Sequence, residues 1–148
     1  MASILPRPDI ESSIWIARPP QDIWDYVSDL SNDTQWREGV SSAQWISDPP
    51  HGVGSTSLHI IEGVGDWPWT AIALEEPHNL AWRVTGGRFE GSQGAYRIDP
   101  DGDGSRFTLE TQVKRNVLMS LLMPILKGML GRQNANDLKK LKAILETG

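Results

Sequence analysis

Apolar and polar residues alternate along much of the chain, which is the pattern of half-buried β-strands. In residues 10–17, Ile10, Ile14 and Ile16 fall on one face. Because short polar turns join consecutive segments of this kind, the strands are expected to form an antiparallel meander. After the first strand, we predict six more over residues 41–47, 56–62, 67–75, 80–85, 89–99 and 106–113.

Helical segments occur at two places in this pattern. Pro20 suits the first turn of a short helix over residues 21–28, and a second short helical turn is predicted at 34–38. The chain ends in a long helix over residues 117–145. A curved antiparallel sheet needs a cover on its concave face, and only this last helix is long enough to supply it. We therefore predict an α+β fold in which a seven-stranded curved sheet and the long helix enclose a small-molecule cavity.

The long helix carries a stripe of small residues. Steps of three and four residues lead from Leu121 through Gly128 to Leu138, and the positions between them include Pro124 and Gly131. Glycine in a helix interior destabilises the helix by about 1 kcal/mol relative to alanine. Two glycines in this stripe are therefore expected to serve a purpose. The stripe is expected to leave space beneath the helix, with Leu121 and Gly128 contacting the ligand. Alternatively, Pro124 and Gly131 divide the segment into two helices.

A second stripe on the same helix is apolar and consists of Leu118, Leu122, Ile125 and Met129. Exposed apolar residues that gather in this way mark interaction surfaces. The stripe is therefore a candidate for contact with a protein partner, with a second copy of the chain in a homodimer, or with a membrane surface.

Length and composition narrow the class of protein. The 148 residues fit one domain, with residues 1–8 as a loose lead-in. There is no cysteine, which excludes disulfides and thiolate chemistry. The formal net charge is −5 and the acidic residues are scattered, which argues against binding to nucleic acid. The chain has no apolar signal region and no apolar stretch of the roughly 20 residues that a membrane crossing needs, so a cytoplasmic location is expected.

Tryptophan is the most frequent aromatic residue: the chain has seven Trp but only two Phe and two Tyr. Trp36, Trp67, Trp69 and Trp82 lie at predicted strand ends or at the exit of the short helix. We expect these four to line the cavity and contact a flat aromatic or apolar ligand. The alternative is that they are ordinary core residues.

Candidate acid–base groups are His59, Glu90 and Tyr96. His59 lies within a predicted strand, and a half-buried histidine can act as acid or base near neutral pH. Glu90 and Tyr96 are six residues apart on one predicted strand and hence on one face, with Arg83 as a possible partner for Glu90. If that face is inward, the three residues form a catalytic set; the alternative is that Glu90 is solvated and His59 is an ordinary sheet residue.

Several motifs with known chemistry are incomplete. Asp101 begins a run that resembles a calcium loop, but the sixth position is Arg106 and the twelfth is Gln112. The glycines between residues 86 and 91 lack the Lys-Ser/Thr of a phosphate-binding loop. The histidines do not have metal-ligand spacing, and there is no nucleophile elbow. We therefore expect neither a metal nor another cofactor.

The layout resembles the SRPBCC superfamily, also called the START or helix-grip fold, and within it the bacterial polyketide cyclase/dehydrase-like proteins. The segments that carry the resemblance are Ala17-Arg18-Pro19-Pro20-Gln21-Asp22-Ile23-Trp24, Asp29 to Val40, Gly52 to Ser55, Glu76 to Trp82, and Asp101 to Thr108. It spans about residues 10–146 and implies a helix-grip sheet with a hydrophobic ligand cavity. Known members include carriers, aromatase/cyclases and chaperone activators.

Three functions remain open from the sequence. The first is binding of a hydrophobic or aromatic small molecule between sheet and helix, as in a lipid or ligand carrier. The second is catalysis of the cyclase/dehydrase kind, in which the pocket folds a reactive poly-ketone and Glu90, Tyr96 or His59 moves protons. The third is protein interaction or dimerisation through the apolar start of the last helix. The resemblance does not decide among them, because one fold supports many functions.

Overall fold

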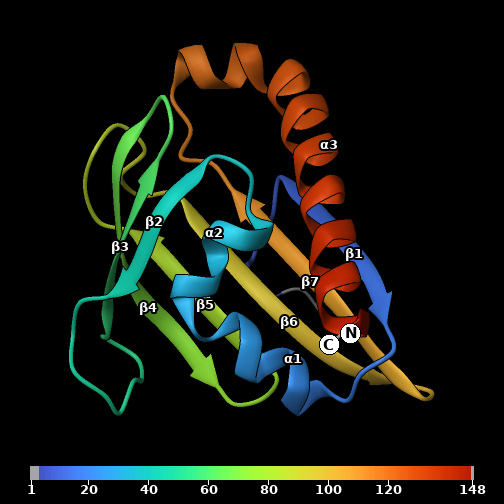
Figure 1. The fold of residues 1–148 in the computed structure, drawn as a ribbon. Coiled ribbons are helices and arrows are strands. Elements are labelled where there is room, and N and C mark those ends of the chain that lie inside the picture. Colours follow the sequence, from blue (N-terminus) through green and yellow to red (C-terminus); the bar gives the residue numbers. More distant parts are fainter. Residues whose placement is uncertain (1–3, 148) are drawn as a thin grey trace.

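The chain folds as one curved sheet that is crossed on its concave side by the C-terminal helix (Figure 1). The computed structural model describes residues 4–147. The helical elements are α1 (Pro20–Val27), the 3-10 turn η1 (Leu30–Asn32), α2 (Asp33–Trp36) and α3 (Val117–Thr147). The strands are β1 (Ile10–Ile16), β2 (Val40–Trp45), β3 (Thr56–Ile61), β4 (Gly65–Glu75), β5 (Asn79–Val84), β6 (Gln93–Asp101) and β7 (Gly104–Gln112).

The predicted meander is confirmed. The seven strands are antiparallel in the order β1-β7-β6-β5-β4-β3-β2, so the first strand closes against the last. Pairing places Ile14 opposite Phe107 and Leu109 opposite Tyr96. Irregularities between Val40 and Ser42 and between Ala71 and Ala73 add to the bend of the sheet.

The largest error in the predicted strands concerns Glu90. Residues 86–92 form a turn, and β6 begins at Gln93 instead of residue 89. Glu90 is exposed in this turn, so it does not share a strand face with Tyr96. Two glycines in the turn, Gly87 and Gly91, adopt positive φ angles, which a continuous strand does not allow.

The C-terminal helix is a single element, and the alternative of two separate helices is wrong. Its first turns lie at an angle to the remainder (Figure 1). Pro124 lies inside the helix, where its ring clashes with the preceding turn and its nitrogen cannot donate a hydrogen bond, so the helix bends.

The face that α3 presents to the sheet differs from the predicted small-residue stripe. Leu121 is 74% exposed, Gly128 is exposed, and a Cβ atom built on Gly128 or Gly131 would meet nothing within 4 Å. The glycines therefore do not create space between the helix and the sheet. The buried face consists of Met123, Asn134, Asp137, Leu138 and Leu141.

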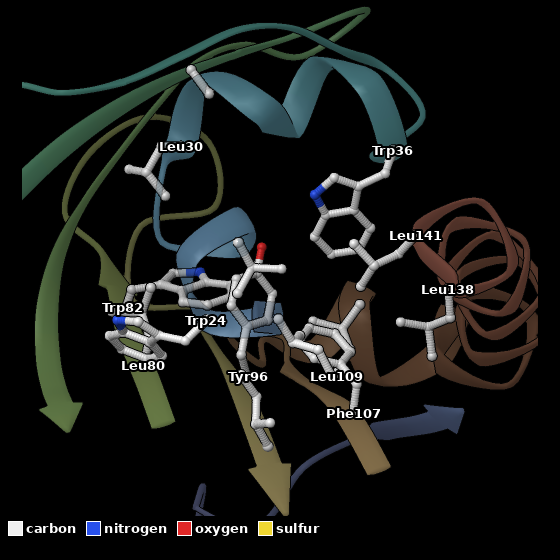
Figure 2. Close-up of a cluster of buried hydrophobic side chains, with 14 of the residues drawn as sticks. Trp24, Leu30, Trp36, Leu80, Trp82, Tyr96, Phe107, Leu109, Leu138 and Leu141 are labelled. Carbon is white, nitrogen blue, oxygen red and sulfur yellow. The ribbon is translucent and has the colours of Figure 1, made fainter. Parts of the chain in front are cut away.

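The main core lies between the concave face of the sheet, the two short helices and the second half of α3. Trp36 reaches from α2 toward Leu138 and Leu141 of α3, as Figure 2 shows. Its ring centroid is 5.8 Å from that of Tyr96 and 6.0 Å from that of Phe107. These contacts join α2, the sheet and the second half of α3 in one core.

The predicted loose lead-in is wrong for the part that the structure describes; residues 1–3 lie outside it. Leu5 is 2% exposed and packs on the opposite face of the sheet with Ala81 and Ala95. The backbone N–H groups of Ile4 and Leu5 donate to the buried carboxylate of Glu110. Within residues 4–147, no helix has both the length and the apolar character needed to cross a bilayer.

Candidate functional site

A cavity of about 840 Å³ lies between the sheet and α3. This volume falls within the range of small-molecule sites. Its wall is largely apolar and is formed by strands β3 to β7, the segment 33–40 that includes α2 and the start of β2, and residues 119–136 of α3. The apolar lining comprises Val40, Ile61, Val64, Trp67, Trp69, Trp82, Val84, Phe89, Leu109, Val113, Met119, Leu126, Met129 and Leu130.

Three of the four predicted tryptophans line this cavity. Trp69 and Trp82 stack with their ring centroids 5.5 Å apart, and Trp67 lies 5.2 Å from Phe89. Trp36 does not contribute to the lining, because it is fully buried in the core beside the cavity. The aromatic wall is thus formed by neighbouring strands of the sheet.

The position of Trp82 depends on Gly94 in the neighbouring strand. The two residues are paired across β5 and β6, and both line the cavity. A Cβ atom on Gly94 would lie 2.4 Å from Cζ2 of Trp82. The absence of a side chain therefore lets the indole lie directly over the backbone of β6.

A buried carboxylate–imidazole pair stands in the cavity wall. Nε2 of His59 lies 2.8 Å from Oδ2 of Asp33, and both residues line the cavity. The side chains are 9% and 1% exposed. Since a carboxylate accepts, Nε2 of the neutral imidazole donates, and Nδ1 is left as an acceptor. Within residues 4–147, neither Nδ1 of His59 nor Oδ1 of Asp33 has a hydrogen-bond partner.

A second polar cluster joins the sheet to the terminal helix through Arg37. Nη1 of Arg37 donates to the Tyr96 hydroxyl at 3.2 Å, and Nε of Arg37 lies 3.4 Å from Oδ2 of Asp137. The other oxygen of Asp137 accepts from the backbone N–H of Glu38. The Tyr96 oxygen is thus an acceptor for Arg37, and among the described residues no acceptor takes its own proton.

Burial governs the protonation of this cluster. It raises the pKa of the Tyr96 hydroxyl, the charge of Asp33 adds to the shift, and Arg37 offsets part of it. Tyr96 is therefore a neutral phenol at physiological pH and a hydrogen-bond donor. Burial also raises the pKa of the Asp137 carboxyl, although Arg37 and the N–H of Glu38 lower it in part.

The structure separates the predicted site residues into two groups. His59, Tyr96, Trp67, Trp69 and Trp82 meet at the cavity. By contrast, Glu90, Leu121 and Gly128 are exposed and lie outside its lining, and Glu90 has no ion pair with Arg83 in the described part of the chain.

The sequence did not predict the polar side chains of the two clusters and the unpaired amide, namely Asp33, Arg37 and Asn134 of the cavity lining and Asp137 behind Arg37. A signal existed for the two on α3, because they interrupt an inward-facing series of apolar residues. Asn134 is 5% exposed, lines the cavity, and its Nδ2 has no partner among residues 4–147. No comparable signal marked Asp33, whose pairing with His59 depends on the fold.

This arrangement can bind an apolar molecule and orient its polar group. The Tyr96 hydroxyl and the Asn134 amide are donors, and Nδ1 of His59 is an acceptor that can also take a proton. Among residues 4–147, no cluster of His, Cys, Asp and Glu side chains suited to holding a metal ion is found.

A family model described as "Polyketide cyclase / dehydrase and lipid transport" matches residues 7–146. The chain belongs to this family. The resemblance to the SRPBCC or START superfamily is thereby confirmed. The family, like the cavity, supports hydrophobic ligand binding in general terms. No curated protein sequence matches the chain significantly.

Solved structures share the fold at low sequence identity. TTHA0849 from Thermus thermophilus is 17% identical, with a TM-score of 0.74 over 93% of this chain and 97% of that one. A START superfamily protein from Mycobacterium smegmatis is 19% identical, with a TM-score of 0.72 over 93% and 96%. The di-domain aromatase/cyclase StfQ of the steffimycin pathway is 13% identical, with a TM-score of 0.72, and the match covers 93% of this chain and 50% of StfQ. At these identities the likeness shows the fold.

Proposed function

We propose that this protein binds a hydrophobic or aromatic small molecule in the cavity between the sheet and α3. The observation that carries the proposal is the wall formed by Trp67, Trp69 and Trp82 around about 840 Å³. Binding draws on the burial of apolar surface, at roughly 25 cal/mol per Å² removed from water. Flat or chain-like ligands suit such a wall. The absence of cysteine is compatible with a cytoplasmic location, which is part of this proposal.

The polar groups of the cavity set the orientation of the ligand. The Tyr96 proton has no acceptor within the described chain, and the Nδ2 group of Asn134 has no partner there either. A buried donor without an acceptor costs about 1–3 kcal/mol. A ligand with an oxygen at one end of an apolar body satisfies these donors, so a carbonyl, hydroxyl or carboxyl compound is favoured over a pure hydrocarbon.

The matched variants Trp67→Ala and Trp15→Ala test this proposal. Both tryptophans are partly buried, but Trp67 lines the cavity whereas Trp15 stacks under Lys142 outside it. We expect Trp67→Ala to weaken binding about tenfold, because an apolar contact worth roughly 1.4 kcal/mol is lost. Trp15→Ala should leave the affinity unchanged.

Intrinsic tryptophan fluorescence provides the measurement, with a panel of fatty acids, isoprenoids and polyphenols as titrants. Circular dichroism of both variants shows whether the fold is retained. The proposal is wrong if no compound in the panel changes the emission of the wild-type protein. Equal weakening by the two variants would also contradict it, because it would place the binding site outside the cavity.

The second candidate function is acid–base catalysis of the cyclase/dehydrase kind, and the Asp33–His59 pair is the observation that favours it. A carboxylate that fixes an imidazole through Nε2 leaves Nδ1 available as a general base. The Tyr96 hydroxyl, held by Arg37, supplies a donor for a developing enolate oxygen. Glu90 has no role in this version, because it is exposed outside the cavity.

The variant His59→Gln distinguishes catalysis from binding alone. With a poly-ketone substrate analogue, we expect turnover to fall at least 100-fold because the base is lost, while the fluorescence response to ligand persists. His78→Gln is the matched control, since His78 is an exposed turn residue outside the cavity. Unchanged turnover in His59→Gln would remove the catalytic role, whereas the binding proposal would stand.

A further inference from the structure

The first half of α3 exposes an unusual number of large apolar side chains. Residues at 117, 118, 121, 122, 125 and 129 lie on one face of the helix. They constitute what we call the apolar ridge, which comprises Val117 (81% exposed), Leu118 (63%), Leu121 (74%), Leu122 (39%), Ile125 (64%) and Met129 (61%). Isolated exposed apolar residues are common, but a contiguous group of this size marks an interaction site.

The charge around the ridge is opposite in sign to that of the whole chain. The formal net charge of the protein is −5, yet residues 114–132 contain four cations and no acidic residue. Lys114 and Arg115 precede the ridge, Lys127 lies within its length, and Arg132 follows it. Arg115 pairs with Asp9, whereas the other three cations have no ion-pair partner in residues 4–147.

The ridge is also continuous with the mouth of the ligand cavity. Met129 belongs to the ridge and lines the cavity, and Arg132 lies beside it in the same lining. Met119 and Phe89 line the cavity and also a second, smaller pocket of about 220 Å³, to which Leu118 and Lys114 contribute as well. Figure 1 shows these first turns of α3 lying at an angle to the rest of the helix, beyond the ends of the strands.

We propose that the apolar ridge docks the protein on an anionic lipid bilayer, with the cavity mouth next to the membrane. An apolar helix face flanked by cations lies in the plane of a membrane interface, where apolar burial and attraction to anionic headgroups add together. A second copy of the chain is a poorer occupant, because a symmetric contact would bring together the three cations of each copy that lack an ion-pair partner in residues 4–147, Lys114, Lys127 and Arg132. The docking does not depend on ligand binding; exchange of the ligand with the bilayer rests on the proposed function.

Co-sedimentation with vesicles tests the docking. One set of vesicles contains phosphatidylcholine only, and the other contains equal parts of phosphatidylcholine and phosphatidylglycerol. We expect the wild-type protein to bind the anionic vesicles and to be released by high salt. Lys114→Gln and Lys127→Gln should each weaken binding about fivefold, since a cation near such a surface is worth about 1 kcal/mol.

A pair of substitutions at equally exposed apolar positions gives the decisive comparison. Leu121→Asp changes the ridge and should weaken vesicle binding at least tenfold. Val53→Asp is the control, because Val53 is 73% exposed in the β2–β3 loop, far along the chain from the ridge. Neither residue lines the cavity, so both variants should keep the fluorescence response to ligand.

Three outcomes would overturn the docking. The first is an absence of wild-type binding to anionic vesicles. The second is equal binding to both vesicle types with no effect of salt. The third is a dimer by light scattering that Leu121→Asp dissociates while vesicle binding is absent, which would assign the ridge to a second copy. In each of these cases ligand titration in solution still reports on the cavity, so failure of the docking and failure of the proposed function are distinguishable.

Discussion

Replacement of Arg37 by Met is expected to lower the free energy of unfolding by about 3 kcal/mol at pH 7, because removal of one partner leaves a buried charge uncompensated. Asp137 is fully buried, and Arg37 is the cation that pairs with it. In a chain of this length such a loss corresponds to a fall in Tm of roughly 10 °C. Arg37→Met also leaves the Tyr96 oxygen without its donor.

The loss of stability in Arg37→Met should depend on pH, and the pKa of Asp137 determines its direction. The folded-state pKa of Asp137 is already raised by burial, and Arg37 is one of the groups that lower it. In Arg37→Met this lowering is lost, so the folded-state pKa of Asp137 rises further above its value in the unfolded chain. The folded protein then takes up a proton first as the pH falls, so the penalty shrinks toward low pH and grows as the pH rises through the folded-state pKa.

Urea denaturation between pH 4.5 and 8 measures this effect. The control is Arg106→Met, since Arg106 pairs with Asp101 at the surface, both side chains being nearly half exposed; a change below about 0.5 kcal/mol is expected there. Adding Asp137→Asn to Arg37→Met should restore part of the stability by removing the buried charge. A penalty that does not change with pH would show that the charge of Asp137 is not its cause.

Local signals in the sequence were sufficient for most of the fold. Strand ends follow from clusters of Gly, Pro and Asp, and the sheet order follows from hairpins between consecutive strands. The segment after β5 misled because Phe89 and Glu90 continue an alternating pattern. Instead, Gly87 and Gly91 adopt positive φ angles, which make the segment a turn. Such backbone angles cannot be inferred from the alternation of apolar and polar residues.

The orientation of α3 was the harder problem, because its first half is apolar on every face. The apolar pattern therefore did not determine which face points to the sheet, and the choice of Leu121 as the starting point was arbitrary. Counted backward from Leu141, steps of three and four residues pass through Leu138, Asn134, Leu130 and Leu126, which belong to the core or line the cavity. Asn134 is the polar residue in this otherwise apolar series, and a polar residue at such a position indicates a site.

The composition of the cavity was predictable only in part. The strand tryptophans were predicted because they lie at the ends of predicted strands, and His59 because it lies within one; all of them line the cavity. The partners of His59 and Tyr96 come from the short helical segment before β2. Their position depends on how that segment packs over the sheet, which no local pattern encodes. Trp36 belongs to the same segment, and it packs in the core for that reason.

Gly94→Ala is expected to disturb the aromatic wall more than any other single-methyl change in the cavity. The new Cβ atom would lie 2.4 Å from Cζ2 and 2.5 Å from Cε2 of Trp82. The indole is rigid and stacks on Trp69, so it must tilt into the cavity or the strands must separate. Such overpacking costs about 1–3 kcal/mol, and a tilted indole would weaken ligand binding at least tenfold.

Removal of the indole tests whether this contact is the cause. In a Trp82→Leu background the same Gly94→Ala change should cost less than about 0.5 kcal/mol, because the three heavy atoms nearest to the added methyl group all belong to the indole of Trp82. Gly52→Ala serves as the control glycine: it has an ordinary φ angle and no atom within 4 Å, so its stability should stay the same or rise slightly. Denaturant unfolding together with ligand titration measures both effects. An equal cost of Gly94→Ala in the two backgrounds would mean that the backbone of β6, and not the indole of Trp82, requires glycine at this position.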